Sequence, residues 1–238
     1  MVDLLPIDLF NGICSIATVL LYFVISFHLV HKFLKYRQKA LLYMGLALFF
    51  LASIWLGLSV SFIFYIVIET SLPFEIQVLI AYGFPFALFF WLLVFTELIY
   101  KKKQKLITII SGIYLILLEV FFYTFLFTNI SLLGVTTGFF YTSWGPFILL
   151  RILINMLIFL TTSVIFIREA NKGEDPENKL KARLILVGTV FLILGGLIYS
   201  IFGIVFIALV ILLVSVLGFY GGIVYPEWVA KMFLRNKK

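Results

Sequence analysis

The sequence predicts an all-α membrane protein, a single bundle of seven transmembrane helices. Three observations predict this class: the composition, the length of the apolar runs, and the distribution of the basic residues. Of the 238 residues, 64% are hydrophobic and only 12% are charged, and the mean hydropathy is +1.20. Soluble domains have roughly 25% charged and 45–50% apolar residues, so this composition excludes a soluble globular or disordered chain.

Apolar runs that are long enough to cross a bilayer account for most of the chain. A helix needs about 20 predominantly apolar residues to span the hydrocarbon core. Five such runs predict transmembrane helices at residues 10–30, 41–68, 76–100, 106–127 and 141–167. A sixth run, residues 184–225, carries no charge over 42 residues and is therefore long enough for two helices. We place these at 184–202 and 204–225, with a turn near residues 200–203.

The basic residues predict the orientation, because the cytoplasmic loops of membrane proteins are enriched in Lys and Arg. Seventeen of the 18 Lys and Arg residues lie in four segments, residues 32–39, 101–105, 168–183 and 231–238. All four segments fall on one side of a membrane only if the run 184–225 crosses it twice. The sequence therefore predicts a multi-pass protein of the cell membrane with its N-terminus outside and its C-terminus in the cytoplasm.

The net charge of +7 indicates which partners to expect. Basic segments at a membrane surface attract anionic lipid headgroups of the cytoplasmic leaflet, so we expect the bilayer itself to be their partner. Nucleic-acid binding would require a folded basic domain. No segment between the predicted helices is long enough to form one, so nucleic acid is not expected as a partner.

Small residues and a proline indicate how the helices pack. Gly218 and Gly222 are four residues apart, a spacing that lets transmembrane helices approach closely. We expect them to pack inside the bundle, and the alternative is a homodimer interface. Gly83 and Pro85 predict a break or kink in the third helix, because proline removes a backbone donor.

One basic residue, Arg151, lies inside a predicted helix, where an ionisable group faces the bundle interior and has a partner in most proteins. At 1.5 Å per residue, Arg151 lies about 24 Å and Glu119 about 21 Å from the cytoplasmic ends of consecutive helices. We therefore expect the two charges to meet in the outer half of the bundle, with Asn155 on the same helix face as Arg151. Two interpretations remain open, a structural ion pair and a polar floor for a ligand that enters from outside.

A second polar group is predicted near the cytoplasmic interface, where His28 and Glu97 lie within about two helical turns of water. The chain has only two histidines, His28 and His31, near one helix end. Metal and haem sites require several ligands from facing elements. We therefore expect no metal and no cofactor.

The sequence lacks the residue patterns of membrane-embedded enzymes. The last predicted helix has no lysine for a retinal Schiff base, and the three aspartates, Asp3, Asp8 and Asp175, all lie outside the predicted spans. A Gly-x-Ser-x-Gly nucleophile motif and a Gly-rich phosphate loop are also absent from the sequence. We therefore expect a protein without catalytic activity.

After the last predicted helix comes Tyr225-Pro226-Glu227-Trp228, followed by Lys231-Met232-Phe233-Leu234. With seven spans and short loops, this pattern resembles the seven-transmembrane sensor module at the N-terminus of prokaryotic, including archaeal, histidine kinases and in stand-alone relatives, and these residues look like the short amphipathic exit of such modules. The resemblance implies a sensor-like or receptor-like protein that signals through a partner, since the chain has no kinase domain. The alternatives are a small transporter or channel subunit, and an accessory subunit of a membrane complex.

Overall fold

A computed structural model describes residues 5–136, 142–202 and 205–234 and confirms a helical bundle with seven helices long and apolar enough to cross a membrane. The helices are α1 (Pro6–Tyr36), α2 (Lys39–Ile68), α3 (Phe74–Ala81), α4 (Phe84–Leu98), α5 (Gln104–Thr128), α6 (Pro146–Lys172), α7 (Pro176–Phe202), α8 (Val205–Val224) and α9 (Glu227–Leu234). Two 3-10 turns, η1 (Lys101–Lys103) and η2 (Ile130–Leu132), and two strands, β1 (Gly134–Thr136) and β2 (Thr142–Trp144), complete the described elements.

The helix boundaries extend the predicted spans, most of all where the chain is basic. The first helix reaches Tyr36, the fifth span ends at Lys172, and the sixth span begins at Pro176. These helices extend past the predicted spans because a helix need not end where the hydrocarbon core ends. The predicted turn near residues 200–203 is corrected at its start, because α7 continues to Phe202; α8 begins at Val205, and the residues between the two helices lie outside the described part of the chain. Gly203, like residue 141 at the predicted start of the fifth span, lies outside the described residues.

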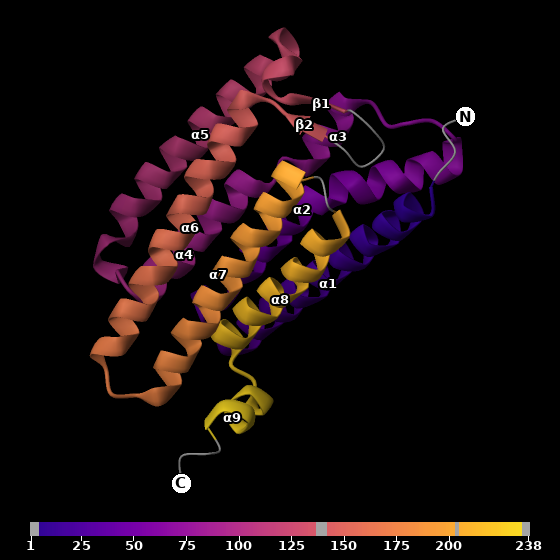
Figure 1. Cartoon of the computed structure of the whole chain (residues 1–238). Helices are drawn as coiled ribbons and strands as arrows, with labels where there is room; N and C mark the ends of the chain where they lie inside the picture. The colour runs from indigo at the N-terminus through magenta and orange to yellow at the C-terminus, as the bar shows by residue number, and fades with distance from the viewer. Residues whose placement is uncertain (1–4, 137–141, 203–204, 235–238) are drawn as a thin grey trace.

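Six spans enclose the interior, and one lies outside them. Going round the ring, α1 packs on α2, α2 on α4, α4 on α6, α6 on α7, α7 on α8, and α8 on α1. The remaining span, α5, packs mainly on α4 and lies at one edge of the bundle in Figure 1. Most of its apolar side chains, such as Ile113 and Ile116, face outward, which is the arrangement expected of a helix surrounded by lipid.

The predicted break in the third span is confirmed between α3 and α4, which are separated by Tyr82 and Gly83. Pro85 lies in the first turn of α4, where a missing N–H costs nothing. A Cβ on Gly83 would lie 2.1 Å from Ser53 Oγ and 2.8 Å from the Phe50 carbonyl oxygen. The glycine therefore allows the break to lie directly against α2.

The glycines of α8 pack inside the bundle, as the sequence predicts. A Cβ on Gly218 would lie 2.8 Å from Gly188 Cα in α7, and one on Gly222 would lie 2.7 Å from a side-chain atom of Ile185. Ser215 adds a hydrogen bond of 2.7 Å from its hydroxyl to the Gly188 carbonyl. Close approach of backbones with a polar contact is how transmembrane helices are held together in lipid.

The interior of the bundle between α4, α6 and α8 is filled by aromatic side chains around Trp91, which is 1% exposed. The ring of Trp91 lies 5.3 Å from Phe159, 5.8 Å from Phe166 and 5.5 Å from Phe219, measured between centroids. Its indole N–H donates a 2.8 Å hydrogen bond to the Thr162 hydroxyl. The buried indole is therefore satisfied, and this part of the interior is closely packed.

The two ends of the bundle differ in character. At one end, β1 and β2 form an antiparallel hairpin that pairs Gly134 with Trp144. Gly134 has φ +143°, a conformation that L side chains rarely adopt. The hairpin and the start of α1 lie at this end, which we call the hairpin end, and α9 lies at the opposite end (Figure 1). Since consecutive spans run in opposite directions, the basic segments gather at the α9 end, here called the basic end.

Candidate functional site

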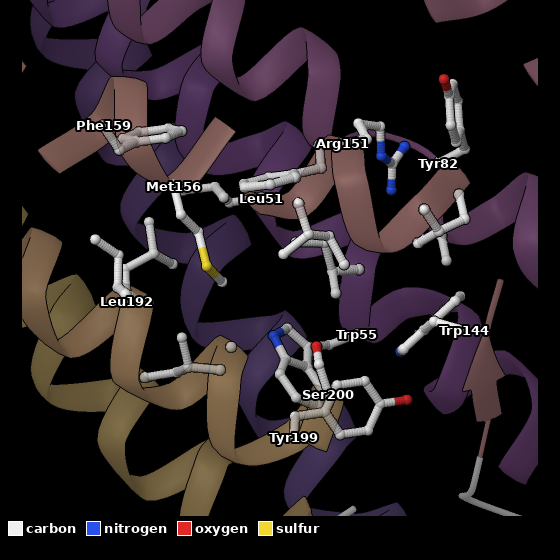
Figure 2. A pocket seen from close by; sticks show the side chains of 18 of the residues that line it. Leu51, Trp55, Tyr82, Trp144, Arg151, Met156, Phe159, Leu192, Tyr199 and Ser200 are labelled. Atoms are coloured by element: carbon white, nitrogen blue, oxygen red, sulfur yellow. The ribbon is translucent and has the colours of Figure 1, made fainter. Parts of the chain in front are cut away.

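A pocket lies inside the ring of helices near the hairpin end (Figure 2). The space between its lining residues is about 840 Å³, including the part that is open to the surroundings. Its walls come from α2, α3, α6 and α7, with single residues from α1, α4, α8, β2 and the break between α3 and α4. We call it the Arg151 pocket, because Arg151 is the one charged residue among the described residues that line it.

Arg151 lies on α6, five residues after the first residue, Pro146, or about 7.5 Å along the axis. Its side chain is buried, with only 7% of the residue exposed. Within the described part of the chain, the guanidinium atoms Nε and Nη1 are buried and have no hydrogen-bond partner. A buried cation with free N–H groups is energetically costly, so this side chain calls for a functional explanation.

The nearest partner of the Arg151 guanidinium is an aromatic ring rather than a carboxylate. The guanidinium carbon lies 4.5 Å from the ring centroid of Tyr82, a distance typical of a cation–π contact. Tyr82 also stacks on Phe122 of α5, with 3.5 Å between centroids, and its hydroxyl donates to the Leu118 carbonyl at 3.1 Å. Tyr82 is fixed by these contacts and supports one side of the guanidinium (Figure 2).

The structure corrects the predicted ion pair between Glu119 and Arg151. Both residues are described, yet no nitrogen of Arg151 lies within 4.0 Å of a Glu119 oxygen. Glu119 Oε1 is itself buried without a partner among the described residues. The reason is Tyr82, whose ring contacts the guanidinium and whose hydroxyl binds the carbonyl of the residue before Glu119. The two charges are therefore more than 4.0 Å apart and form no ion pair.

Asn155 lies on the same face of α6 as Arg151, as the sequence predicts, and both are buried. Its Oδ1 accepts a 2.9 Å hydrogen bond from the Tyr114 hydroxyl of α5. Neither Asn155 nor Glu119 is among the residues that line the pocket. Of the three predicted residues, only Arg151 has direct access to a ligand, and Asn155 joins α5 to α6 through Tyr114.

Aromatic side chains from α2, α7 and β2 form one wall of the pocket. Trp55 of α2 packs on Tyr199 of α7 with 4.9 Å between ring centroids, and Trp144 of β2 lies 6.4 Å from Tyr199. In Figure 2 these rings and Ser200 lie on one side of the pocket, and Arg151 with Tyr82 lies on another. The hairpin thus contributes to the site through Trp144.

The structure gives the predicted second group, His28 and Glu97, separate partners. His28 on α1 is exposed, and its ring lies 5.9 Å from that of Tyr220 in α8. Glu97 on α4 pairs with Lys101 at 2.9 Å and accepts a 3.2 Å hydrogen bond from Gln104. Both contacts of Glu97 close the connection between α4 and α5 and give it a local structural role.

Comparisons with protein-family models, with curated proteins and with solved structures found no match for this chain. Among the described residues, no cluster of three or more His, Cys, Asp or Glu side chains is placed to hold a metal ion. The chain is a polytopic membrane protein, and the Arg151 pocket is its candidate functional site.

Proposed function

We propose that this protein is a receptor-like membrane protein without catalytic activity, which binds a ligand in the Arg151 pocket and signals through a partner. The observation that carries the proposal is the buried guanidinium at the wall of the pocket, whose Nε and Nη1 have no hydrogen-bond partner among the described residues. Buried ionisable groups in membrane proteins are rare and are concentrated at functional sites. A ligand that accepted its hydrogen bonds would remove the cost of burying it.

The packing below the pocket favours a receptor over a transporter. The aromatic cluster around Trp91 fills the interior between the pocket and the basic end, with Trp91, Phe159 and Phe219 each 1% exposed. A transported substrate would have to displace these rings. A ligand that stays in the pocket would only shift the helices that line it, among which α6 and α7 continue to the basic end.

The proposed orientation puts the hairpin end outside and the basic end in the cytoplasm, following the distribution of Lys and Arg. The basic end then contacts anionic headgroups and presents α9, whose Met232 and Phe233 are more than half exposed. These features support the resemblance to stand-alone seven-helix sensor modules, which implies a cytoplasmic or membrane signalling partner at this end.

Cysteine labelling tests the orientation directly. In a Cys14→Ser background, single cysteines at Ser71 and Thr136 are expected to react with a membrane-impermeant maleimide added to intact cells. Cysteines at Gln104 and Gly173 are expected to react only after permeabilisation. Labelling of Gly173 in intact cells would contradict the proposed orientation.

A tethered group in the pocket tests the receptor mechanism without knowledge of the ligand. In the same background, a cysteine at Ile193, which lines the pocket, is modified with an alkyl methanethiosulfonate. We expect the hydrogen exchange of the α6–α7 connection and of α9 to change, whereas the same label at Gly112 on α5 leaves it unchanged. Unchanged exchange at the basic end would contradict the mechanism. Substrate-dependent flux into proteoliposomes would support the transporter instead.

A further inference from the structure

The Arg151 pocket combines one buried cation with a lining that is otherwise uncharged among the described residues. The atoms Nε and Nη1 carry three N–H groups between them, and both atoms are buried without an acceptor. A ligand that satisfied these donors would need an anionic oxygen group, because oxyanions form the strongest hydrogen bonds to guanidinium. The polar part of the ligand is therefore an anion held at Arg151.

The charges near the pocket favour an anion with a single negative charge. Arg151 supplies one positive charge, and the carboxylate of Glu119 is near enough to act on it without forming an ion pair. A doubly charged phosphate would leave negative charge uncompensated in a low-dielectric interior, which is costly. A carboxylate brings one charge and two acceptor oxygens, which suits the site better.

The remaining walls suit an apolar chain. Leu192, Phe159, Met156 and Leu51 lie on the side of the pocket away from Arg151 and Tyr82 (Figure 2). Burying apolar surface there is favourable to a ligand that arrives from water. A ligand that arrives from lipid loses no apolar contact when its chain enters this part of the pocket.

The lining residues of α6 and α7 that are nearest each other are Met156 and Gly196. Both are half-buried. A Cβ on Gly196 would lie 2.6 Å from the Met156 methyl, so the absence of a side chain leaves room that the flexible methionine alone occupies.

We propose that the pocket binds an amphiphile with one carboxylate and one long apolar chain, a ligand of the fatty-acid class. This inference rests on the proposed function and specifies the ligand of the same site. The carboxylate contacts Arg151 beside the ring of Tyr82, and the chain lies between α6, α7 and α2.

Tryptophan quenching measures this binding. Trp55 and Trp144 line the pocket, so dibromostearate bound there quenches their fluorescence in phosphatidylcholine nanodiscs. The saturable part of the quenching is then competed with stearate, stearyl alcohol, octadecyl phosphate or acetate at a pH where stearate is ionised. We expect stearate to compete, stearyl alcohol to be weaker by about tenfold to a hundredfold, and acetate not to compete. If stearyl alcohol competes as well as stearate, Arg151 does not select the headgroup. If octadecyl phosphate competes better than stearate, the proposed preference for a carboxylate is wrong.

Two variants separate binding from folding. Gly196→Leu narrows the pocket with Arg151 intact and is expected to abolish saturable quenching, whereas Gly112→Leu on α5, which is outside the lining, is expected to retain it. Arg151→Met is expected to lose the preference for stearate over stearyl alcohol while still binding both. Saturable quenching that survives in Gly196→Leu, or a preference that survives in Arg151→Met, would overturn the inference.

The outcome is distinguishable from that of the receptor test. If the wild type shows no saturable quenching, the proposal of a carboxylate ligand is wrong. The coupling measured with the tethered group at Ile193 is not affected by that result. Conversely, stearate binding without any change in exchange at the basic end would support the ligand class and contradict the receptor mechanism.

Discussion

Replacing Arg151 by methionine is expected to stabilise the ligand-free protein. Two guanidinium nitrogens are buried without partners, and each unsatisfied group costs about 1–3 kcal/mol. The substitution removes this cost and keeps an unbranched apolar side chain. Against it stands the loss of the contact with Tyr82, at 4.5 Å from the guanidinium carbon, which is worth up to about 2 kcal/mol. The two unsatisfied nitrogens together cost about 2–6 kcal/mol, so after the loss of the whole contact the expected net gain in the free energy of unfolding is about 0–4 kcal/mol.

Thermal unfolding of the purified protein in detergent, with bound lipid removed, measures this effect. For a chain of about this size, each kcal/mol corresponds to about 2–4 °C in Tm. The matched control is Leu150→Met on the outer face of α6, which is 59% exposed and should leave Tm unchanged. A loss of about 3–5 kcal/mol, the cost of breaking a buried ion pair, would show instead that Arg151 pairs directly with Glu119.

Three further predictions concern the packing of the bundle. Gly83→Ala is expected to lower the free energy of unfolding by about 1–3 kcal/mol through overpacking against α2. Gly112→Ala, whose Cβ meets one atom at 3.9 Å, should not lower it. Equal effects of the two substitutions in thermal unfolding would contradict the close approach at Gly83. Gly218→Leu is expected to destabilise the protein without changing its oligomeric state in light scattering, and dissociation of a dimer would instead indicate an interface. Trp91→Phe removes the hydrogen bond to Thr162 and is expected to cost about 1 kcal/mol, and a neutral result would contradict that contact.

The seven spans could be predicted from the sequence because they depend on local properties. The length of each apolar run and the side on which Lys and Arg fall need no knowledge of which helices touch. The break at Gly83 and Pro85 and the packing of Gly218 followed in the same way, since proline and small residues act on their own segment. The hairpin of β1 and β2 was not predicted, because strands of three residues leave no periodic pattern.

The site could be predicted only in part, because its geometry depends on tertiary contacts. Arg151 was found from the sequence as the single basic residue within an apolar run. Tyr82 was missed, since nothing in the sequence indicates that a tyrosine at a helix break would occupy the space beside the guanidinium. Depth along the helix axes suggested that Glu119 would reach Arg151, but similar depth does not fix the direction in which two side chains point.

Mass spectrometry of the protein purified from its own membranes identifies the molecule that the pocket holds. Wild-type protein and Arg151→Met are isolated in the same mild detergent, and the lipids released on denaturation are compared with those of the surrounding membrane. We expect a long-chain carboxylate to be enriched in the wild type and not in the variant. Identical lipid profiles for the two proteins would contradict this expectation.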